Sequence, residues 1–396
     1  MTRVSIDFCA RMALPYILFL SLTRVIPYLP SIPDVIYYSS FLGVIIWFVL
    51  RSGATILYTF LPFLSVIFLS VWVNDIPAYY KIWYRVFAYL AIILTVGPFV
   101  INPVILAWRR LLFVYTLLSI RWVVIISFGA WCIGWEKVNG ISGFEGITNH
   151  SMLMGPLGGI SLIYSLYRFY VSDKATSRYK EIGIALISFA IMLLAGSRSA
   201  IVSSILGIIF LLSRIYRHRV ISLLQIFFSI LVLLAVTSSI WWPLTKRFRD
   251  KMESSVKSGS ITSTRDNSWD DRLIEFKAFP VFGVGFATIN TEYAKSSIVN
   301  TKTGLIEPGS AWLFFLSSMG LVGFLSFFIP YIRFIYISYK KEVIGMNGYL
   351  LGALLFMFFF HLFFEAHLTA GGAYFCFFPW LLLSECNRVL NINNNK

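Results

Sequence analysis

Arg198 is the residue in this sequence best suited to bind a charged group. It lies in the run Gly196-Ser197-Arg198-Ser199 between two apolar stretches, so small neighbours leave its guanidinium accessible. A guanidinium can donate to two oxygens of one phosphate at once. Two interpretations stay open: a phosphate ligand at the lipid–water boundary, or an arginine that ends a helix and reaches toward the headgroups.

Three further charged residues lie in one polar segment, residues 241–311, which interrupts an otherwise apolar chain. Arg265 and Arg272 could bind the same phosphate as Arg198. Glu307 could act as a general base or bind a sugar hydroxyl. Glu307 is followed by Pro-Gly-Ser, so it could also be only an acid before a helix that Ser310 caps.

Within this polar segment, the spacing of Trp269, Leu273 and Phe276 predicts a helix with one apolar stripe. We expect it to begin near residues 267–268 and to end at Pro280. The following Pro280-Val-Phe-Gly283-Val-Gly285 run lacks the strand and third glycine of a dinucleotide-binding loop, which excludes that site. The basic, serine-rich residues 243–263 are expected to be mobile or to lie on the surface.

Composition restricts the class of protein. The chain is 58% hydrophobic and 13% charged, with a mean hydropathy of +0.78. So few polar side chains could not cover the surface of a soluble globular protein. The net charge of +15 comes mostly from short loops between apolar blocks, which is typical of orientation signals and argues against nucleic-acid binding.

The apolar blocks predict an all-α polytopic membrane protein with about twelve transmembrane helices and one large extracytoplasmic loop that contains short helices. The basic loops place both termini in the cytoplasm and residues 241–311 outside. The chain then divides into helices 1–9 (residues 1–240), the loop (241–311), and helices 10–12 with the tail (312–396). The expected spans are residues 12–29, 35–50, 54–73, 82–101, 111–133, 151–170, 182–196, 199–213, 220–240, 312–337, 347–364 and 369–386.

The two spans beside Arg198 are expected to be too short to cross fully. Residues 181–196 would give roughly 24 Å of helix against roughly 30 Å of hydrocarbon, so the tip would lie slightly below the outer surface. Arg85 falls near the outer end of its span and could add to a phosphate site. Arg121 falls nearer mid-membrane, where an ion partner or a water-filled cavity is expected. His150 and His367 are weak candidates for catalysis.

Four motifs, taken in order, resemble the superfamily of O-antigen polymerases and O-antigen ligases, bacterial inner-membrane glycosyltransferases with a GT-C-like helical fold. The motifs are Thr148-Asn149-His150-Ser151, the Gly196–Ser199 run, the segment from Asp271-Arg272 to Gly285, and the segment from Glu307 through Met319-Gly320.

The resemblance implies a glycosyltransferase that needs no metal or other cofactor. Arg198 and Arg272 would grip the diphosphate of an undecaprenyl-linked oligosaccharide and stabilise its departure, and Glu307 would accept the proton of the attacking hydroxyl. Arg85, Arg265, Asn149 and Trp312 would contact substrate. The expected partners are the lipid-linked glycan, membrane lipid and a chain-length regulator protein.

The resemblance also favours polymerase activity over ligase activity. Ligases of this superfamily carry a His-Asn pair before the span that corresponds to residues 312–337, and this chain has no histidine in residues 241–311. This favours a polymerase of O-antigen, capsule or exopolysaccharide repeats. The alternatives are an O-antigen ligase that uses lipid A core as acceptor, and a transporter or flippase of the same glycolipids.

Overall fold

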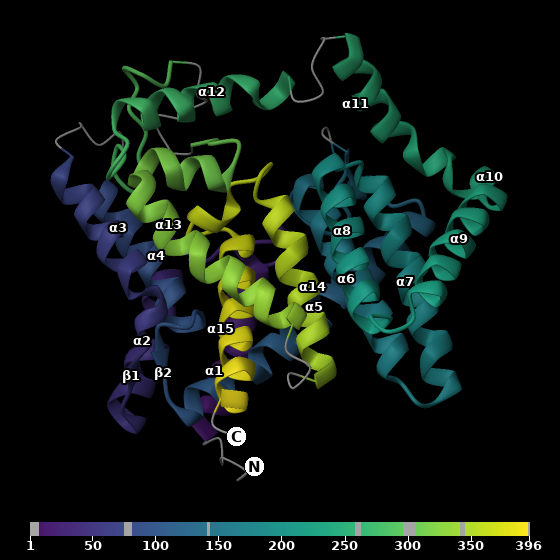
Figure 1. The fold of residues 1–396 in the computed structure, drawn as a ribbon, viewed down its shortest axis with the longest axis horizontal. Coiled ribbons are helices and arrows are strands. Elements are labelled where there is room, and N and C mark those ends of the chain that lie inside the picture. The colour runs from purple at the N-terminus through teal and green to yellow at the C-terminus, as the bar shows by residue number, and fades with distance from the viewer. Residues whose placement is uncertain are drawn as a thin grey trace.

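A computed structural model describes residues 8–74, 81–140, 143–257, 263–295, 306–340 and 345–394 of the chain. The fold is helical, with two short antiparallel strand pairs (Figure 1). The helices are α1 (Phe8–Thr23), α2 (Asp34–Ser52), α3 (Leu61–Val73), α4 (Ile82–Val96), α5 (Pro103–Cys132), α6 (Ser151–Val171), α7 (Ala175–Ala195), α8 (Arg198–Ile215), α9 (Val220–Val236), α10 (Ser238–Trp241), α11 (Lys246–Lys257), α12 (Ser263–Ala278), α13 (Ala311–Lys340), α14 (Gly345–His361) and α15 (Tyr374–Asn394).

The remaining elements are short connectors. Strands β1 (Thr55–Ile56) and β2 (Val100–Ile101) pair with Thr55 opposite Ile101, and β3 (Asn139–Gly140) pairs with β4 (Gly143–Phe144). Four single-turn 3₁₀ helices occur in the described part of the chain: η1 (Tyr58–Phe60), η2 (Glu136–Val138), η3 (Pro243–Thr245) and η5 (His367–Thr369).

Each of the twelve predicted spans contains a helix, which supports the all-α membrane class. Among the described residues, four helices are long and apolar enough to cross a membrane: α2, α5, α8 and α13. Shorter apolar helices occupy most of the other expected positions. The number of crossings therefore stays a prediction.

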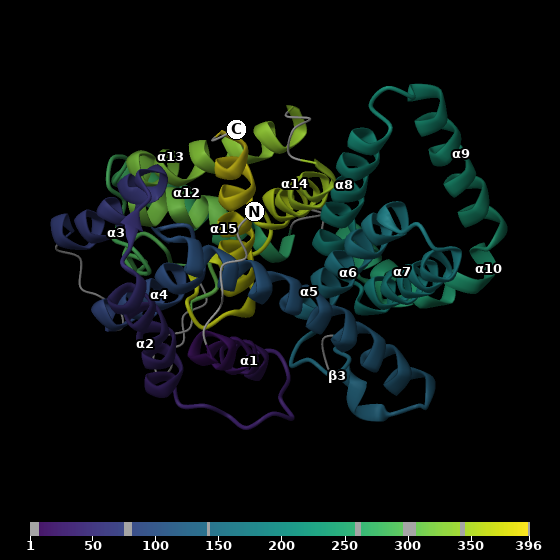
Figure 2. The same ribbon diagram turned by 90° about the horizontal axis from the view of Figure 1, so that it is seen from below.

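α15 packs against α1, α4, α5, α13 and α14, while α6–α10 form a group to one side (Figure 2). Every residue from Tyr374 to Val389 is buried. Around it, the rings of Phe60, Phe63, Phe327 and Trp380 lie within 6 Å of one another in tilted and edge-on pairs. Such aromatic pairs add to the burial of apolar area, so this cluster fixes how the helices pack.

The loop helices lie together at one end of the bundle. In Figure 1, α11 and α12 run across the top of the molecule, and α15 ends at the opposite end. The basic, serine-rich stretch contains the helix α11, in which only Ser255 is buried, and this agrees with a segment that lies on the surface. α12 begins at Ser263, earlier than predicted, and ends at Ala278, two residues before Pro280 as predicted.

The hairpin that carries Arg198 is longer than the sequence suggested. α7 has 21 residues, or roughly 32 Å at about 1.5 Å per residue, and α8 has 18 residues, or roughly 27 Å. The prediction that both legs are too short to cross is therefore wrong for α8, which is long and apolar enough to cross a membrane. α7 is longer than predicted because its first polar turns continue the helix beyond the apolar block. The tip is a tight turn in which Gly196 adopts φ 60° and the Ser197 hydroxyl caps α8.

The segment that follows α12 binds to a break in α13. Gly320 has φ 64° inside α13, and residues 280–285 lie against the break. The backbone amides of Val284 and Gly285 donate to the Ser317 and Ser318 carbonyls at 2.9 Å, and Leu321 N donates to Pro280 O at 2.8 Å. The glycine-rich run predicted as a turn therefore also joins the loop to α13 through backbone hydrogen bonds. This contact between residues 280–285 and α13 is here called the dock.

Candidate active site

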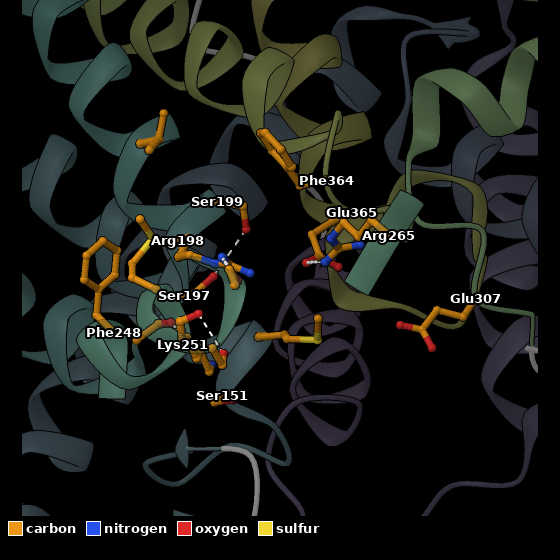
Figure 3. Close-up of a pocket in the computed structure, with 16 residues that line it drawn as sticks. Ser151, Ser197, Arg198, Ser199, Phe248, Lys251, Arg265, Glu307, Phe364 and Glu365 are labelled. Atoms are coloured by element: carbon orange, nitrogen blue, oxygen red, sulfur yellow. Dashed lines mark hydrogen bonds and ion pairs between the residues drawn. The ribbon is translucent and has the colours of Figure 1, made fainter. Parts of the chain in front are cut away.

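A cavity of about 560 Å³, here called the basic cavity, opens between the hairpin tip and the loop helices. Three cationic side chains line it: Arg198 at the start of α8, Lys251 of α11 and Arg265 of α12. Arg198 Nη1 donates to the Ser255 hydroxyl at 2.7 Å, and Lys251 Nζ donates to the Gly196 carbonyl at 3.4 Å. The basic cavity therefore gathers positive charge from three separate elements (Figure 3).

Two helix N-termini add to this positive potential. α6 begins at Ser151 and α8 begins at Arg198, and both residues line the basic cavity. The first turn of a helix favours negative charge because its backbone amides point outward along the dipole. Burial, together with Arg198 and Arg247 nearby, lowers the pKa of Lys251. A bound anion would relieve this concentration of charge, so the basic cavity is suited to a phosphate or diphosphate.

A second cavity, of about 780 Å³, adjoins the basic cavity. Its lining includes the rings of Tyr38, Tyr84 and Phe314 and the charged side chains of Asp34 and Arg85. Aromatic faces beside polar groups are suited to sugars, which present apolar faces and hydroxyls together. Arg85 Nη1 donates to the Ala287 carbonyl at 2.7 Å, so Arg85 belongs to this second cavity rather than to the basic one.

The wall between the two cavities is made of charged residues. Arg265, Glu307 and Glu365 line both cavities, together with Met152. Arg265 Nη2 donates to Glu365 Oε1 at 2.5 Å, and its Nη1 donates to the Gly309 carbonyl at 3.0 Å. In Figure 3 this ion pair lies between Arg198 on one side and Glu307 on the other. The shared wall thus places a cation and two carboxylates where both cavities reach them.

Glu307 is exposed at the entry to α13, as predicted, and Ser310 caps that helix by accepting from Leu313 N at 3.4 Å. Arg198, Arg265 and Glu307, predicted from the sequence, line one cavity. Lys251 and Glu365 were not among the predicted site residues. The amphipathic pattern of α11 could have indicated Lys251, whereas no local signal marks Glu365.

Arg272 lies elsewhere, so the expectation that it meets Arg198 is not met. It lines neither cavity, and its guanidinium is fully buried with Nη1 2.9 Å from Glu275 Oε2. The ring of Phe314, 5.9 Å from this guanidinium, lines the second cavity in its place. The physical reason is helix phase: Arg272 faces the α12–α13 contact rather than the open side of α12.

Trp312 and Asn149 also lie outside both cavities. The Trp312 indole is buried, packs against the rings of Phe327 and Tyr331, and donates to the Phe359 carbonyl at 2.9 Å. Asn149 is exposed, and its Nδ2 donates to the Arg24 carbonyl at 3.3 Å. The Trp312 indole thus joins α13 to α14. The predicted contact of the exposed Asn149 with substrate stays a prediction.

Arg121 has an ion partner, as expected for an arginine near the middle of the membrane. Its Nη2 lies 2.5 Å from Glu181 Oε2, and both side chains are nearly fully buried. Arg168 lies 3.7 Å from the other oxygen of the same carboxylate. This ion pair joins α5 to α7, and neither Arg121 nor Glu181 lines either cavity.

Most of the residues that build this arrangement lie in a part of the chain that matches a known protein family. Residues 183–328 match the family model described as O-antigen ligase. This stretch of the chain is therefore similar to the O-antigen ligase family. The match contains the hairpin tip, α11, α12, Glu307 and the break in α13, and it confirms the resemblance to the polymerase and ligase superfamily. A search of curated proteins found no match.

Three of the elements that line the basic cavity, α8, α11 and α12, lie in the matched region, while Ser151 and Glu365 lie outside it. The match points to a glycosyltransferase-like membrane enzyme of polysaccharide or O-antigen processing.

Proposed function

We propose that the protein is a polysaccharide polymerase of the bacterial inner membrane. It transfers a glycan from undecaprenyl diphosphate to a sugar hydroxyl of a second lipid-linked repeat unit, on the extracytoplasmic face. The observation that carries this proposal is the basic cavity, where Arg198, Lys251, Arg265 and two helix N-termini surround one space. A diphosphate is the anion that such a site fits and is already an activated leaving group.

The basic cavity would hold the donor. As the bond between the anomeric carbon and the diphosphate breaks, negative charge grows on the leaving oxygen. Guanidinium and ammonium groups already in place stabilise that charge without having to reorganise, which is the main way such sites lower a barrier. The second cavity would hold the acceptor sugar against Tyr38 and Tyr84, and a carboxylate of the shared wall would accept its proton.

Polymerase activity is favoured over ligase activity because residues 241–311 contain no histidine. The ligase alternative draws on the description of the matched family and on His367, which lines the second cavity 3.5 Å from Glu365. A ligase would use the same basic cavity for the donor and would differ in the acceptor that the second cavity takes.

The test is the replacement of Arg198 and of Arg265 by alanine, each in a strain that lacks the native chain. We expect each variant to lose about 100-fold or more of its polymer, because one aligned electrostatic donor contributes roughly that much to a rate. Chain-length ladders on gels measure the product, and the amount of tagged protein in membranes measures insertion.

Lys257→Ala is the matched control, since it removes a cation from α11 that is exposed and lines neither cavity. It should give normal ladders. Normal ladders from Arg198→Ala or Arg265→Ala at normal membrane levels would refute the proposed diphosphate site.

A further inference from the structure

We propose that Glu365 is the general base of the transfer, and that its uptake of the proton releases the charge of Arg265 toward the departing diphosphate. This inference rests on the proposed function and deepens it, because it assigns the proton and couples it to the leaving group through one ion pair.

Glu365 is held in a fixed position between the two cavities. It lies in the turn between α14 and η5, and only 6% of it is exposed. Its backbone carbonyl accepts from Ala311 N at 3.3 Å, which ties the turn to the start of α13. One carboxylate oxygen accepts from Arg265, and the other lies 3.5 Å from His367 Nε2. A base that must meet one hydroxyl needs this kind of positioning.

The second carboxylate of the wall, Glu307, has a different environment. Glu307 is exposed, whereas Glu365 is buried. The pKa of Glu365 is raised to about 7, because burial, with a smaller contribution from the charge of Glu307, outweighs the opposite effects of Arg265 and His150. Two carboxylates whose surroundings differ in this way usually have different roles. A base with a pKa near neutrality is the one suited to accept a proton at neutral pH.

The proposed step balances as follows. The acceptor hydroxyl oxygen forms a bond to the anomeric carbon of the donor sugar, and the bond from that carbon to the diphosphate oxygen breaks. The bonding electron pair leaves with the undecaprenyl diphosphate. The hydroxyl proton moves to Oε2 of Glu365, the carboxylate oxygen that does not accept from Arg265. The products are a new glycosidic bond, undecaprenyl diphosphate and a neutral Glu365 carboxyl group.

Arg265 couples the two halves of this step. Before transfer, the Glu365 carboxylate at 2.5 Å neutralises much of the guanidinium charge. When Glu365 takes the proton, that charge is no longer balanced, and the same guanidinium lines the basic cavity with Arg198. Its attraction for the leaving diphosphate is therefore stronger in the transition state than in the ground state, which is the condition for an interaction to raise kcat.

The experiment compares Glu365→Gln, Glu307→Gln and Arg265→Ala in the purified full-length protein. Rates are measured with lipid-linked repeats extracted from a strain that lacks the chain. Binding is measured separately with undecaprenyl diphosphate in detergent micelles. We expect Glu365→Gln to lower kcat by about 100-fold or more, since a positioned base contributes roughly 10²–10⁴. Its Kd for undecaprenyl diphosphate should stay equal or fall, because Arg265 is then free of a charged partner.

The pH dependence gives a second readout. The base must be deprotonated to accept a proton, so the wild-type rate should fall as the pH is lowered through about 7. Glu365→Asp should retain part of the rate and move this limb to lower pH, because the intrinsic pKa of aspartate is lower.

Three outcomes would overturn the assignment of Glu365. They are a near-normal kcat in Glu365→Gln, a loss of kcat in Glu307→Gln at least as large as in Glu365→Gln, and a rise in Kd in Glu365→Gln as large as in Arg265→Ala. The last would mean that Glu365 only positions Arg265. If undecaprenyl diphosphate fails to bind the wild type, or binds Arg198→Ala equally well, the proposed function itself fails instead.

Discussion

At the residue scale, Arg272 holds the loop in place, unlike Arg198 and Arg265, which line a cavity and can bind a ligand. Its guanidinium and the Glu275 carboxylate are both fully buried, 2.9 Å apart. Glu275 Oε1 also accepts from Asn290 N at 2.7 Å. Removing one member of a buried ion pair leaves an uncompensated charge in a medium that solvates it poorly.

We expect Arg272→Ala to destabilise the protein by about 3–5 kcal/mol, with a lower Tm in detergent and less protein in membranes. The double variant Arg272→Met/Glu275→Leu replaces both charges by apolar groups of similar size and should recover most of the Tm and the polymer ladder. A stable double variant that makes no polymer would show that the Arg272 charge is needed for catalysis, against the position seen here.

The structure brings together three of the residues that the sequence proposed for the site. Arg198, Arg265 and Glu307 were found from residue type and from their place beside apolar blocks, and the structure brings them to one cavity. Glu365 could not be found in this way, because its contact with Arg265 joins residues 100 positions apart. Trp312 is buried and lines neither cavity, and residue type alone could not predict this, because it does not give the side of the helix on which a residue lies.

At the element scale, the break in α13 decides where the loop sits. A Cβ on Gly320 would lie 2.2 Å from the Val281 carbonyl oxygen, and a Cβ on Gly283 would lie 2.4 Å from the Met319 amide nitrogen. Both glycines have positive φ, near 64° and 68°. The two backbones can approach this closely only because neither residue has a side chain.

Gly320→Ala should therefore loosen the dock between residues 280–285 and α13. We expect a lower Tm and faster proteolysis within the loop, because alanine is strained at this φ and would collide with backbone. Limited proteolysis of membranes measures the change. Gly43→Ala in α2, where nothing lies within 4 Å, is the control. Equal protease sensitivity in the two variants would count against the dock.

Element type was predictable from composition, but element limits were not. The apolar blocks gave twelve helix positions, and Pro280 gave the end of α12. The starts of α7 and α12 were missed because polar residues at a helix end look like loop in a hydropathy pattern. The dock on α13 was missed because it is made by backbone groups, which leave no side-chain signature.

At the scale of the whole molecule, two cavities on one side of the bundle suggest that two large substrates meet there. Loss of the whole protein should then stop chain growth. We expect a deletion strain to display single repeats as caps on its surface, measured by gel analysis of extracted glycolipids. Accumulation of long lipid-linked polymer instead would show that chain growth continues without this protein, and would favour the ligase alternative.

The wall between the cavities also affects how a polymer would grow. The elongated product carries its own diphosphate on the acceptor side, whereas Arg198 and Lys251 lie on the donor side. Before that product can act as donor, it has to leave one compartment and enter the other past Arg265 and Glu365. We therefore expect the enzyme to add one repeat unit each time it binds its substrates, and to release the product before the next addition. The polymers should then have a broad distribution of lengths unless a second protein narrows that distribution.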